Sequence, residues 1–283
     1  MKFAAFILAF LLPFTLAAPV SESDDMVMTP AGPLPASNVH AVPTGGSVNV
    51  VGNEIHLLDA SNNVVHVAQA DYTLRPDWQS GWIAYAWWYN SVTSSPINWF
   101  NATWTVPPVP LTYHGQIVYL FNGMQPASGN AILQPVLQYG VSPAGGGAYW
   151  AVANWYLVSG HIYHTSLVNV SVGQALYGIM APTSSSGSLF NYVSWFSGIG
   201  DPLYVTNSSQ LDWATEALEA YSINAATDYP AGATLFYNIN LYRTTGIPSV
   251  LWTATYNTAD GLTASVVANG AVNAQVRFSY PTN

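Results

Sequence analysis

Residues 116–157 read QIVYLFNGMQPASGNAILQPVLQYGVSPAGGGAYWAVANWYL, and this stretch decides the fold class. Runs rich in aromatic and β-branched residues occupy 116–121, 132–139 and 149–157, and such runs are typical of strands. The triplet Gly145-Gly146-Gly147 is followed by neither a Lys nor a helix start. We therefore interpret it as a hairpin turn and not as a phosphate-binding loop.

The same pattern continues on both sides of this stretch. Further apolar runs lie at 167–172 and 176–180, and Pro-rich and Ser-rich turn segments lie at 106–110 and 184–187. Turn signals at intervals of roughly 8 to 12 residues indicate an all-β protein. We predict a single domain over 77–283, an antiparallel two-sheet β-sandwich of the jelly-roll or concanavalin-like kind.

Charged residues are scarce and unevenly placed. They make up 6% of the chain, against about 25% in an average soluble protein. Four basic residues stand against thirteen acidic ones, so the chain has little with which to neutralise phosphates, and nucleic acid is excluded as a partner. No Asp, Glu, Lys or Arg lies between Trp78 and Gly200. A catalytic carboxylate after Trp78 must then come from the carboxyl-terminal part, where there are six candidates, Asp201, Asp212, Glu216, Glu219, Asp228 and Asp260.

The amino terminus predicts secretion. Residues 1–17 have a minimal basic start, an apolar stretch and a small-X-small cleavage signal, as in a secretory signal peptide. No second run approaches the roughly 20 apolar residues that span a bilayer, so we expect an extracellular protein without a membrane anchor. Sequons at Asn101, Asn169 and Asn207 predict glycosylation. The chain has no cysteine and so no disulfides.

Low charge also suggests where the protein works. Acid unfolds proteins by protonating paired carboxylates and by accumulating self-repulsion, and this chain has little of either to lose. We therefore expect an acid-stable domain built for acidic surroundings. The alternative is that low charge is only drift in a secreted β-protein.

The segment before the main domain is divided in two. Residues 18–44, rich in Pro, Ser and Asp, predict a linker, and residues 47–68 predict a small β-meander. The meander is too small to fold alone. It is therefore either extra strands on the main body or part of a propeptide, with a boundary near Arg75-Pro76.

One segment favours a helix by local propensity. Residues 209–221 contain good helix formers, a start resembling a capping box at Ser209 and Asp212, and an apolar helical face. Sheet context can override such a propensity.

Two glutamines are the best polar candidates in the charge-free stretch. Gln134 and Gln138 lie an even number apart, so both share one face of a strand otherwise made of core residues. They either line a cleft or are amides satisfied by neighbouring strands. His161 and His164 would point to opposite faces of a strand, so we expect no metal site. No cofactor motif is present, and a Ser/His/Asp triad stays open although the chain lacks a Gly-X-Ser-X-Gly elbow.

The order of several short motifs resembles the fungal glutamic peptidases (eqolisins). These motifs are Thr105-Val106-Pro107, a strand ending in Asn122-Gly123, Leu137-Gln138-Tyr139-Gly140, Trp155-Tyr156, Val172-Gly173-Gln174 and Trp213-Ala214-Thr215-Glu216. They are scattered over residues 97–245. The chain lacks the Asp-Gly loop and the cysteines of that family, and Asn154 stands where the family strand has an acidic residue. The amino-terminal segment is acidic, whereas the family's propeptides tend to be basic.

The resemblance implies a β-sandwich with a catalytic Gln-Glu dyad. Gln138 matches the family's glutamine and Glu216 its glutamate, with Gln134 as the rival glutamine and Asn154 and Trp155 as supporting residues. The glutamate would act as general base on a water, and the amide would orient that water and donate to the oxyanion. The resemblance also implies a strand around Glu216, which would place Glu216 on one face and Glu219 on the other.

These observations lead to three hypotheses. The first is a secreted acid endopeptidase that acts on polypeptides as a monomer. The second is a carbohydrate-binding or carbohydrate-active β-sandwich protein that binds a polysaccharide through exposed Trp and Tyr side chains. The third is a secreted structural protein without an active site.

Overall fold

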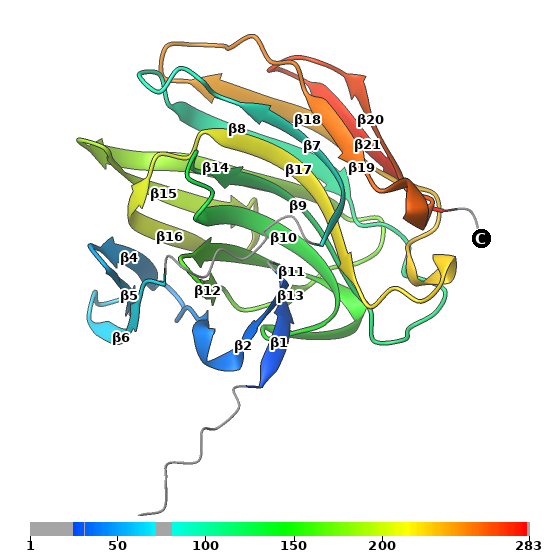
Figure 1. The fold of residues 1–283 in the computed structure, drawn as a ribbon, viewed down its shortest axis with the longest axis horizontal. Coiled ribbons are helices and arrows are strands. Elements are labelled where there is room, and N and C mark those ends of the chain that lie inside the picture. Colours follow the sequence, from blue (N-terminus) through cyan, green and yellow to red (C-terminus); the bar gives the residue numbers. More distant parts are fainter. Residues whose placement is uncertain (1–24, 31, 72–80, 282–283) are drawn as a thin grey trace, which may run out of the picture.

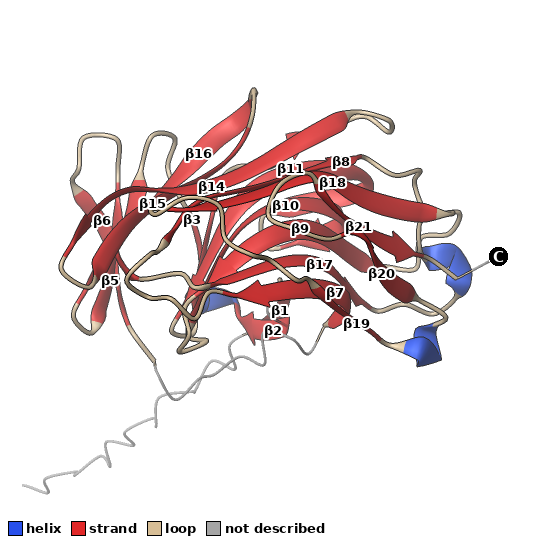
Figure 2. Cartoon of the chain, turned by 90° about the horizontal axis from the view of Figure 1, so that it is seen from above, coloured by secondary structure: helices blue, strands red, loops and turns tan. Residues whose placement is uncertain are grey.

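A computed structural model describes residues 25–30, 32–71 and 81–281. The expected signal peptide and the expected boundary at Arg75-Pro76 lie outside the described residues. The described chain is almost entirely β, with two large sheets packed face to face (Figures 1 and 2). The all-β sandwich prediction is confirmed.

The first large sheet has nine strands, and the strand order is β19-β7-β17-β9-β10-β11-β12-β3, with β13 pairing with β11. Its strands are β3 (Val39–Ala41), β7 (Trp82–Tyr89), β9 (Ile117–Gln125), β10 (Ala131–Ser142), β11 (Gly145–Val158), β12 (His161–His164), β13 (Val168–Asn169), β17 (Trp213–Tyr221) and β19 (Thr253–Tyr256). A hairpin does join β10 to β11, but its turn is Pro143-Ala144 and not the expected glycine triplet. Gly145, Gly146 and Gly147 are the first residues of β11 and pair with Ser142, Val141 and Gly140.

The second large sheet has ten strands in the order β20-β21-β18-β8-β14-β15-β16-β4-β5-β6. Its strands are β4 (Ser47–Val51), β5 (Glu54–Leu58), β6 (Val64–Gln69), β8 (Ile97–Thr105), β14 (Ala175–Ser186), β15 (Leu189–Phe196), β16 (Ile199–Ser209), β18 (Ala233–Arg243), β20 (Thr263–Ala268) and β21 (Ala274–Ser279). A separate hairpin joins β1 (Met26–Thr29) to β2 (Gly32–Pro35).

Helices are limited to three short 3-10 turns in the described chain, η1 (Ala36–Asn38), η2 (Ala226–Asp228) and η3 (Thr258–Asp260). Within those described residues, no helix has the length and apolar character needed to cross a membrane.

The segment expected to be a linker is part of the folded body instead. Residues 26–41 form β1, β2, η1 and β3, and β3 pairs in parallel with β12. The meander β4-β5-β6 adds to the other sheet through a parallel pairing of β4 with β16. The amino-terminal segment, defined here as residues 25–71, therefore extends both sheets at the same side of the sandwich (Figure 1).

Residues 213–221 form a strand despite their helical propensity. β17 lies between β7 and β9 and pairs with both along its length. The hydrogen bonds of these two ladders satisfy the backbone groups of β17 on both sides. Their contribution outweighs the helical propensity of the segment, which amounts to a few tenths of a kcal/mol per residue. The strand that the resemblance implied around Glu216 is observed.

The two sheets approach each other closely at Gly178. A Cβ there would lie 2.6 Å from Asn122 Oδ1, 2.9 Å from Pro135 Cγ and 3.0 Å from the ring of Trp104. Gly178 is the fourth residue of β14, and its carbonyl accepts a hydrogen bond from Asn122 Nδ2.

We expect Gly178→Ala to destabilise the protein by about 1–3 kcal/mol, because two of the three obstructing groups are rigid rings. Chemical denaturation measures the change. Ser185→Ala, at an exposed position of the same strand, is the control and is expected to stay within about 0.5 kcal/mol of the parent. Equal stability of the two variants would contradict the close approach.

Candidate functional site on the outer face of the nine-stranded sheet

The nine-stranded sheet has two faces that must be distinguished. Its inner face packs on the other sheet and carries residues of the main core such as Leu120, Leu137 and Leu218. Its outer face carries a second apolar cluster that includes Phe121 and Val136. Side chains alternate between the two faces along a strand, so residues an even number of positions apart lie on the same face and residues an odd number apart lie on opposite faces.

Glu216 belongs to the inner face. It alternates with Ala214 and Leu218, which are part of the main core, and it pairs across the strands with Asn122. Glu216 has no exposed surface, and neither carboxyl oxygen accepts a hydrogen bond from the described residues. Burial raises the pKa of this carboxyl well above its ordinary value. Glu216 is therefore enclosed in the sandwich interior, where burial favours the neutral form of its carboxyl.

Gln138 belongs to the outer face and is fully engaged by its own hairpin. Its Nε2 donates to the carbonyls of Gly140 and Gly145, each at 2.9 Å. Its Oε1 accepts a hydrogen bond from the Ser142 hydroxyl at 2.9 Å. Both amide hydrogens are used, so only the oxygen of Gln138 retains capacity for a further hydrogen bond.

The expected pair, Gln138 and Glu216, is therefore not brought together. The two residues lie on the same sheet, on β10 and β17 with β9 between them, but on opposite faces. The physical reason is that side chains alternate between the two faces along β17. Because the Glu216 side chain lies on the inner face, those of Trp213 and Glu219 lie on the outer face. The carboxyl group on the face of Gln138 is that of Glu219.

Glu219 and Gln138 share one row across three strands. Each pairs with Tyr119 of β9, one from either side. Alternate strands of a sheet lie about 10 Å apart, so the carboxyl and the amide flank one tyrosine. Glu219 has no exposed surface and accepts a hydrogen bond from the Tyr221 hydroxyl.

Burial dominates the electrostatics of this row. It raises the pKa of Glu219 to about 8, although the hydroxyl of Tyr221 and the indole of Trp82 act in the opposite direction. Burial and the nearby Glu219 also raise the pKa of Tyr119. In the structure both groups therefore carry their protons at mildly acidic pH, and both can act as hydrogen-bond donors.

Gln134 is the second amide of the outer face. It is fully buried, and neither its Nε2 nor its Oε1 has a hydrogen-bond partner in the described chain. It stands opposite Trp155 of β11. The expectation that Gln134 and Gln138 share a face is confirmed by their alternation with Val136, a member of the outer cluster.

The two residues expected to support the dyad have separate positions. Asn154 lies on the inner face, where its Nδ2 donates to the Asp201 carbonyl and its Oδ1 accepts from the Ser194 hydroxyl, both at 2.9 Å. Asn154 thus ties the two sheets together. Trp155 lies on the outer face, with its ring centre 4.9 Å from that of His164 and 6.4 Å from that of Tyr119.

An aromatic cleft opens beside this row. It has a volume of about 230 Å³, and its walls are Trp82, Tyr85, Trp87, Gln125, Trp213 and Thr215. The Trp213 ring centre lies 4.6 Å from that of Trp87. The lining has no carboxylate and no basic side chain, so the cleft suits an uncharged group that stacks on aromatic rings.

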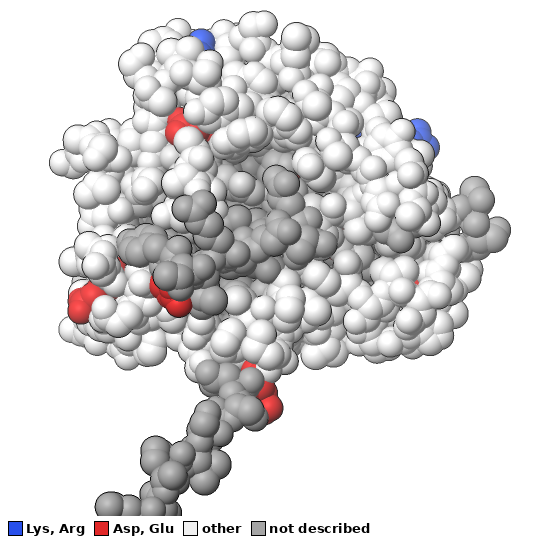
Figure 3. Space-filling view, viewed as in Figure 1, with Lys and Arg blue, Asp and Glu red and all other residues white. Residues whose placement is uncertain are grey.

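The described surface around this region is nearly uncharged. In the view of Figure 3, the few charged side chains are scattered and form no patch. The aromatic cleft and the row of Gln138, Tyr119 and Glu219 lie on the same face. The functional groups of this face are amides, hydroxyls, aromatic rings and the buried carboxyl of Glu219.

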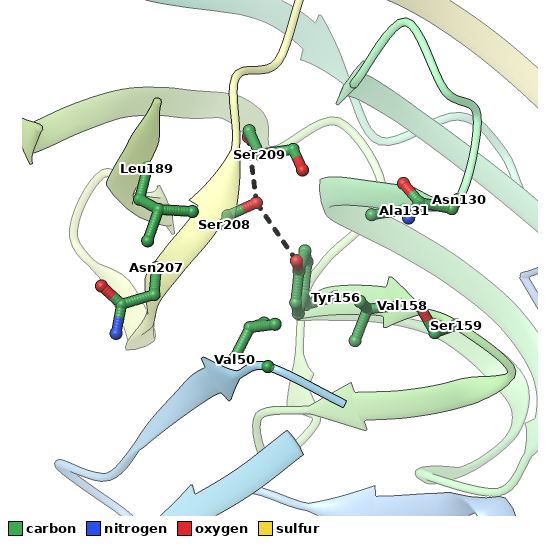
Figure 4. Close-up of a pocket in the computed structure, with 11 residues that line it drawn as sticks. Val50, Asn130, Ala131, Tyr156, Val158, Ser159, Leu189, Asn207, Ser208 and Ser209 are labelled. Carbon is green, nitrogen blue, oxygen red and sulfur yellow. Dashed lines mark hydrogen bonds between the residues drawn. The ribbon is translucent and has the colours of Figure 1, made fainter. Parts of the chain in front are cut away.

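A larger cavity elsewhere is less suited to catalysis. About 310 Å³ in volume, it lies where β4 meets the ends of β11 and β16 (Figure 4). The Tyr156 hydroxyl lies 3.2 Å from Ser208 Oγ, and no carboxyl, imidazole or amino group lines the cavity. It offers hydroxyls and amides but no group that exchanges protons near neutral or acidic pH.

The three sequons differ in access. Asn169 is exposed on β13. Asn207 is half-buried and its Nδ2 donates to Asn49 Oδ1 at 2.8 Å. Asn101 is 1% exposed and its Nδ2 donates to the Asn238 carbonyl. The folded chain leaves no room for a glycan at Asn101, and glycosylation at Asn169 and Asn207 stays a prediction.

The amino-terminal segment lies against the same outer face. Leu34 of β2 is buried in the outer apolar cluster, and Met28 and Val39 pack against it. A cavity of about 680 Å³ separates parts of this segment from the loop after β10. Part of the amino-terminal segment therefore packs on the outer apolar cluster.

The sequence analysis included Glu219 among six candidate carboxylates but paired Gln138 with Glu216 instead, and it did not identify Tyr119. The available signal was the alternation of side chains along a strand, because Glu219 was expected on the face opposite Glu216. What the pattern could not give was which face looks into the sandwich, since both faces of β17 are buried.

Comparisons with known proteins give likeness of structure alone. No family model and no curated protein matches the sequence. Among solved structures, the chain is similar to a scytalido-glutamic peptidase bound to a peptide-based transition-state analogue, with a TM-score of 0.49 and 17% identity over 71% of this chain and 98% of that one. It is also similar to SCP-B of the eqolisin family in complex with the tripeptide Ala-Ile-His, with a TM-score of 0.48 and 16% identity over the same shares.

Proposed function

We propose that this protein is a secreted, acid-active endopeptidase that works on the outer face of the nine-stranded sheet. Glu219 is the acid-base group, and Gln138 and Tyr119 are its partners. The observation that carries the proposal is the row itself, a buried carboxyl and a fixed amide on either side of one tyrosine. Glu216, the carboxyl that the family resemblance favoured, is replaced by Glu219 in this role.

The groups of the row have complementary tasks. Ionised Glu219 takes a proton from a water molecule, and the resulting hydroxide adds to the peptide carbonyl carbon. The free acceptor capacity of Gln138 Oε1 orients the water, and the Tyr119 hydroxyl donates to the oxyanion that develops. Glu219 then gives the proton to the amide nitrogen as the carbon–nitrogen bond breaks, which leaves the carboxylate as it began.

Glu219 must be ionised for the first step, and burial is what raises its pKa. Movement of the amino-terminal segment away from the face would hydrate the carboxyl and return its pKa towards the ordinary value near 4.5. Activity at acidic pH therefore requires an open outer face. The low charge of the domain suits such surroundings.

The direct test is incubation of the secreted protein with a denatured protein substrate between pH 2 and 6, followed by mass spectrometry of the products. We expect internal cleavage with a maximum on the acidic side. Absence of cleavage across the range, before and after removal of the amino-terminal segment, would overturn the proposal.

The aromatic cleft favours a second candidate function, the binding of a neutral polysaccharide. Trp87 and Trp213 form an uncharged stacking surface, and sugars bind well to such surfaces. We expect Trp213→Ala to weaken retention on a neutral glucan column by about tenfold if the cleft takes sugar. Trp195→Ala, a half-buried tryptophan of the other sheet, is the control. Equal retention of both variants and the parent would remove this candidate.

A further inference from the structure

The cavity of about 310 Å³ beside β4, β11 and β16 has no part in the proposed reaction, and its walls combine aliphatic and hydroxyl side chains (Figure 4). Small-molecule sites in proteins begin at about this volume. An engineered apolar cavity of roughly 150 Å³ binds one benzene molecule. A cavity of about twice that volume therefore accommodates a ligand of roughly a dozen non-hydrogen atoms.

Four aliphatic side chains line this cavity, those of Val50, Ala131, Val158 and Leu189. Val158 belongs to the main core and is buried, whereas Leu189, at the start of β15, is 44% exposed. A hydrocarbon chain in the cavity would cover the exposed surface of Leu189. Removal of such apolar surface from water favours binding.

Three buried hydroxyl side chains supply the polar part of the lining. Tyr156, Ser159 and Ser208 are each no more than 3% exposed. The Tyr156 hydroxyl lies 3.2 Å from Ser208 Oγ, and the Ser208 hydroxyl donates to the Ser209 carbonyl at 3.1 Å. A serine hydroxyl donates one hydrogen bond and accepts two. Ser208 can therefore accept a further hydrogen bond from a ligand hydroxyl.

The electrostatics of the cavity select against ions. Among the described residues, those that line it include no carboxylate, imidazole, amino or guanidinium group. An ionised group that entered would lose its hydration without gaining a partner of opposite charge. The ligand that fits these walls is consequently neutral, with an apolar body and a hydroxyl end.

Two residues of the wall have a backbone conformation that side chains other than glycine seldom adopt. The φ angle is 46° at Ser159 and 57° at Asn207. The Ser159 amide donates to the Asn130 carbonyl at 3.0 Å, and the Asn207 amide donates to Asn191 Oδ1 at 2.9 Å. Such conformations concentrate at functional sites such as ligand clamps. Here the chain's own hydrogen bonds hold both turns, so the cavity is already formed before a ligand enters.

We propose that this cavity is a binding site for a small neutral amphiphile, an alcohol with a saturated chain of about eight to ten carbon atoms. Its hydroxyl donates to Ser208 Oγ, and its chain packs on Val50, Val158 and Leu189. Tyr156 and Val158 lie on the inner face of the nine-stranded sheet, whereas the proposed peptidase row lies on the outer face. The binding site therefore does not depend on peptidase activity.

Isothermal titration calorimetry at pH 7 with 1-octanol, 1-butanol and octanoate tests the class of ligand. We expect 1-octanol to bind at least about tenfold more tightly than 1-butanol, because its additional methylene groups leave water. It should also bind at least about tenfold more tightly than octanoate, whose carboxylate finds no cation in the cavity. Absence of 1-octanol binding, or equal affinity for either of the other two compounds, would overturn the proposal.

Two variants locate the bound alcohol. Leu189→Ser removes apolar wall at an exposed position and should weaken 1-octanol binding by about fivefold or more. Ser208→Ala removes the acceptor of the ligand hydroxyl and should weaken it by about threefold to tenfold. Leu235→Ser makes the first change at a leucine of β18 that is 37% exposed and outside the lining, and its affinity should stay within about twofold of the parent. Unchanged affinity in both Leu189→Ser and Ser208→Ala would place the alcohol elsewhere and overturn the site.

Discussion

Glu219→Gln is expected to lower peptide hydrolysis by about 100-fold to 10,000-fold, the usual contribution of an acid-base group. The amide keeps the size of the side chain and a hydrogen bond with Tyr221, but it cannot take the proton from water. Initial rates on an unfolded protein substrate at pH 4, with the outer face opened by removal of the amino-terminal segment, measure the effect.

Glu216→Gln is the matched control for that experiment. It makes the same chemical change on the same strand, three residues away, but on the inner face. At pH 4 the Glu216 carboxyl is protonated, because burial raises its pKa, so the amide is a close mimic and the rate should stay within a few-fold of the parent. Loss of activity in Glu216→Gln together with full activity in Glu219→Gln would restore the pairing that the family resemblance favoured.

The fold could be predicted from the sequence because its signals are local. The runs 116–121 and 132–139 correspond to β9 and β10, and the hairpin expected around the glycine triplet is present, with its turn at Pro143-Ala144 just before Gly145. The relation between Gln134 and Gln138 also followed from alternation alone. These features depend on side-chain period and turn formers, which a single sequence displays.

The site could not be predicted to the same degree. Residues from Ala214 to Ala220 are buried on both faces of β17, so no polar and apolar alternation distinguishes the inner face from the outer one. The match of Trp213-Ala214-Thr215-Glu216 to the family motif therefore led to Glu216 being chosen over Glu219. Alternation along the strand had already placed these two carboxylates on opposite faces. Only the packing of the second sheet decides which carboxyl is enclosed between the sheets.

The amino-terminal segment was misjudged for a related reason. Composition rich in Pro and Ser predicted a linker over 18–44, yet β3 gains its partner from β12, more than a hundred residues away. Strand pairing at such a separation leaves no mark in the local sequence.

The protein should lose stability as the pH rises from about 5 to about 8. Both Glu216 and Glu219 are fully buried and have pKa values raised above the ordinary 4.5. A carboxyl with a raised pKa stabilises the fold fully below its unfolded pKa, and that stability is lost as the pH rises through the folded pKa. The slope for a single such carboxyl is about 1.4 kcal/mol per pH unit between its unfolded and folded pKa values.

For Glu219, whose folded pKa is about 8, the full loss is on the order of 4–5 kcal/mol between pH 4.5 and 8. Chemical denaturation at pH 5, 6.5 and 8 measures it. Glu219→Gln and Glu216→Gln should each flatten the profile, because an amide does not ionise, and the double variant should flatten it most. A parent chain that is more stable at pH 8 than at pH 5 would show that these carboxyls ionise freely in the folded state.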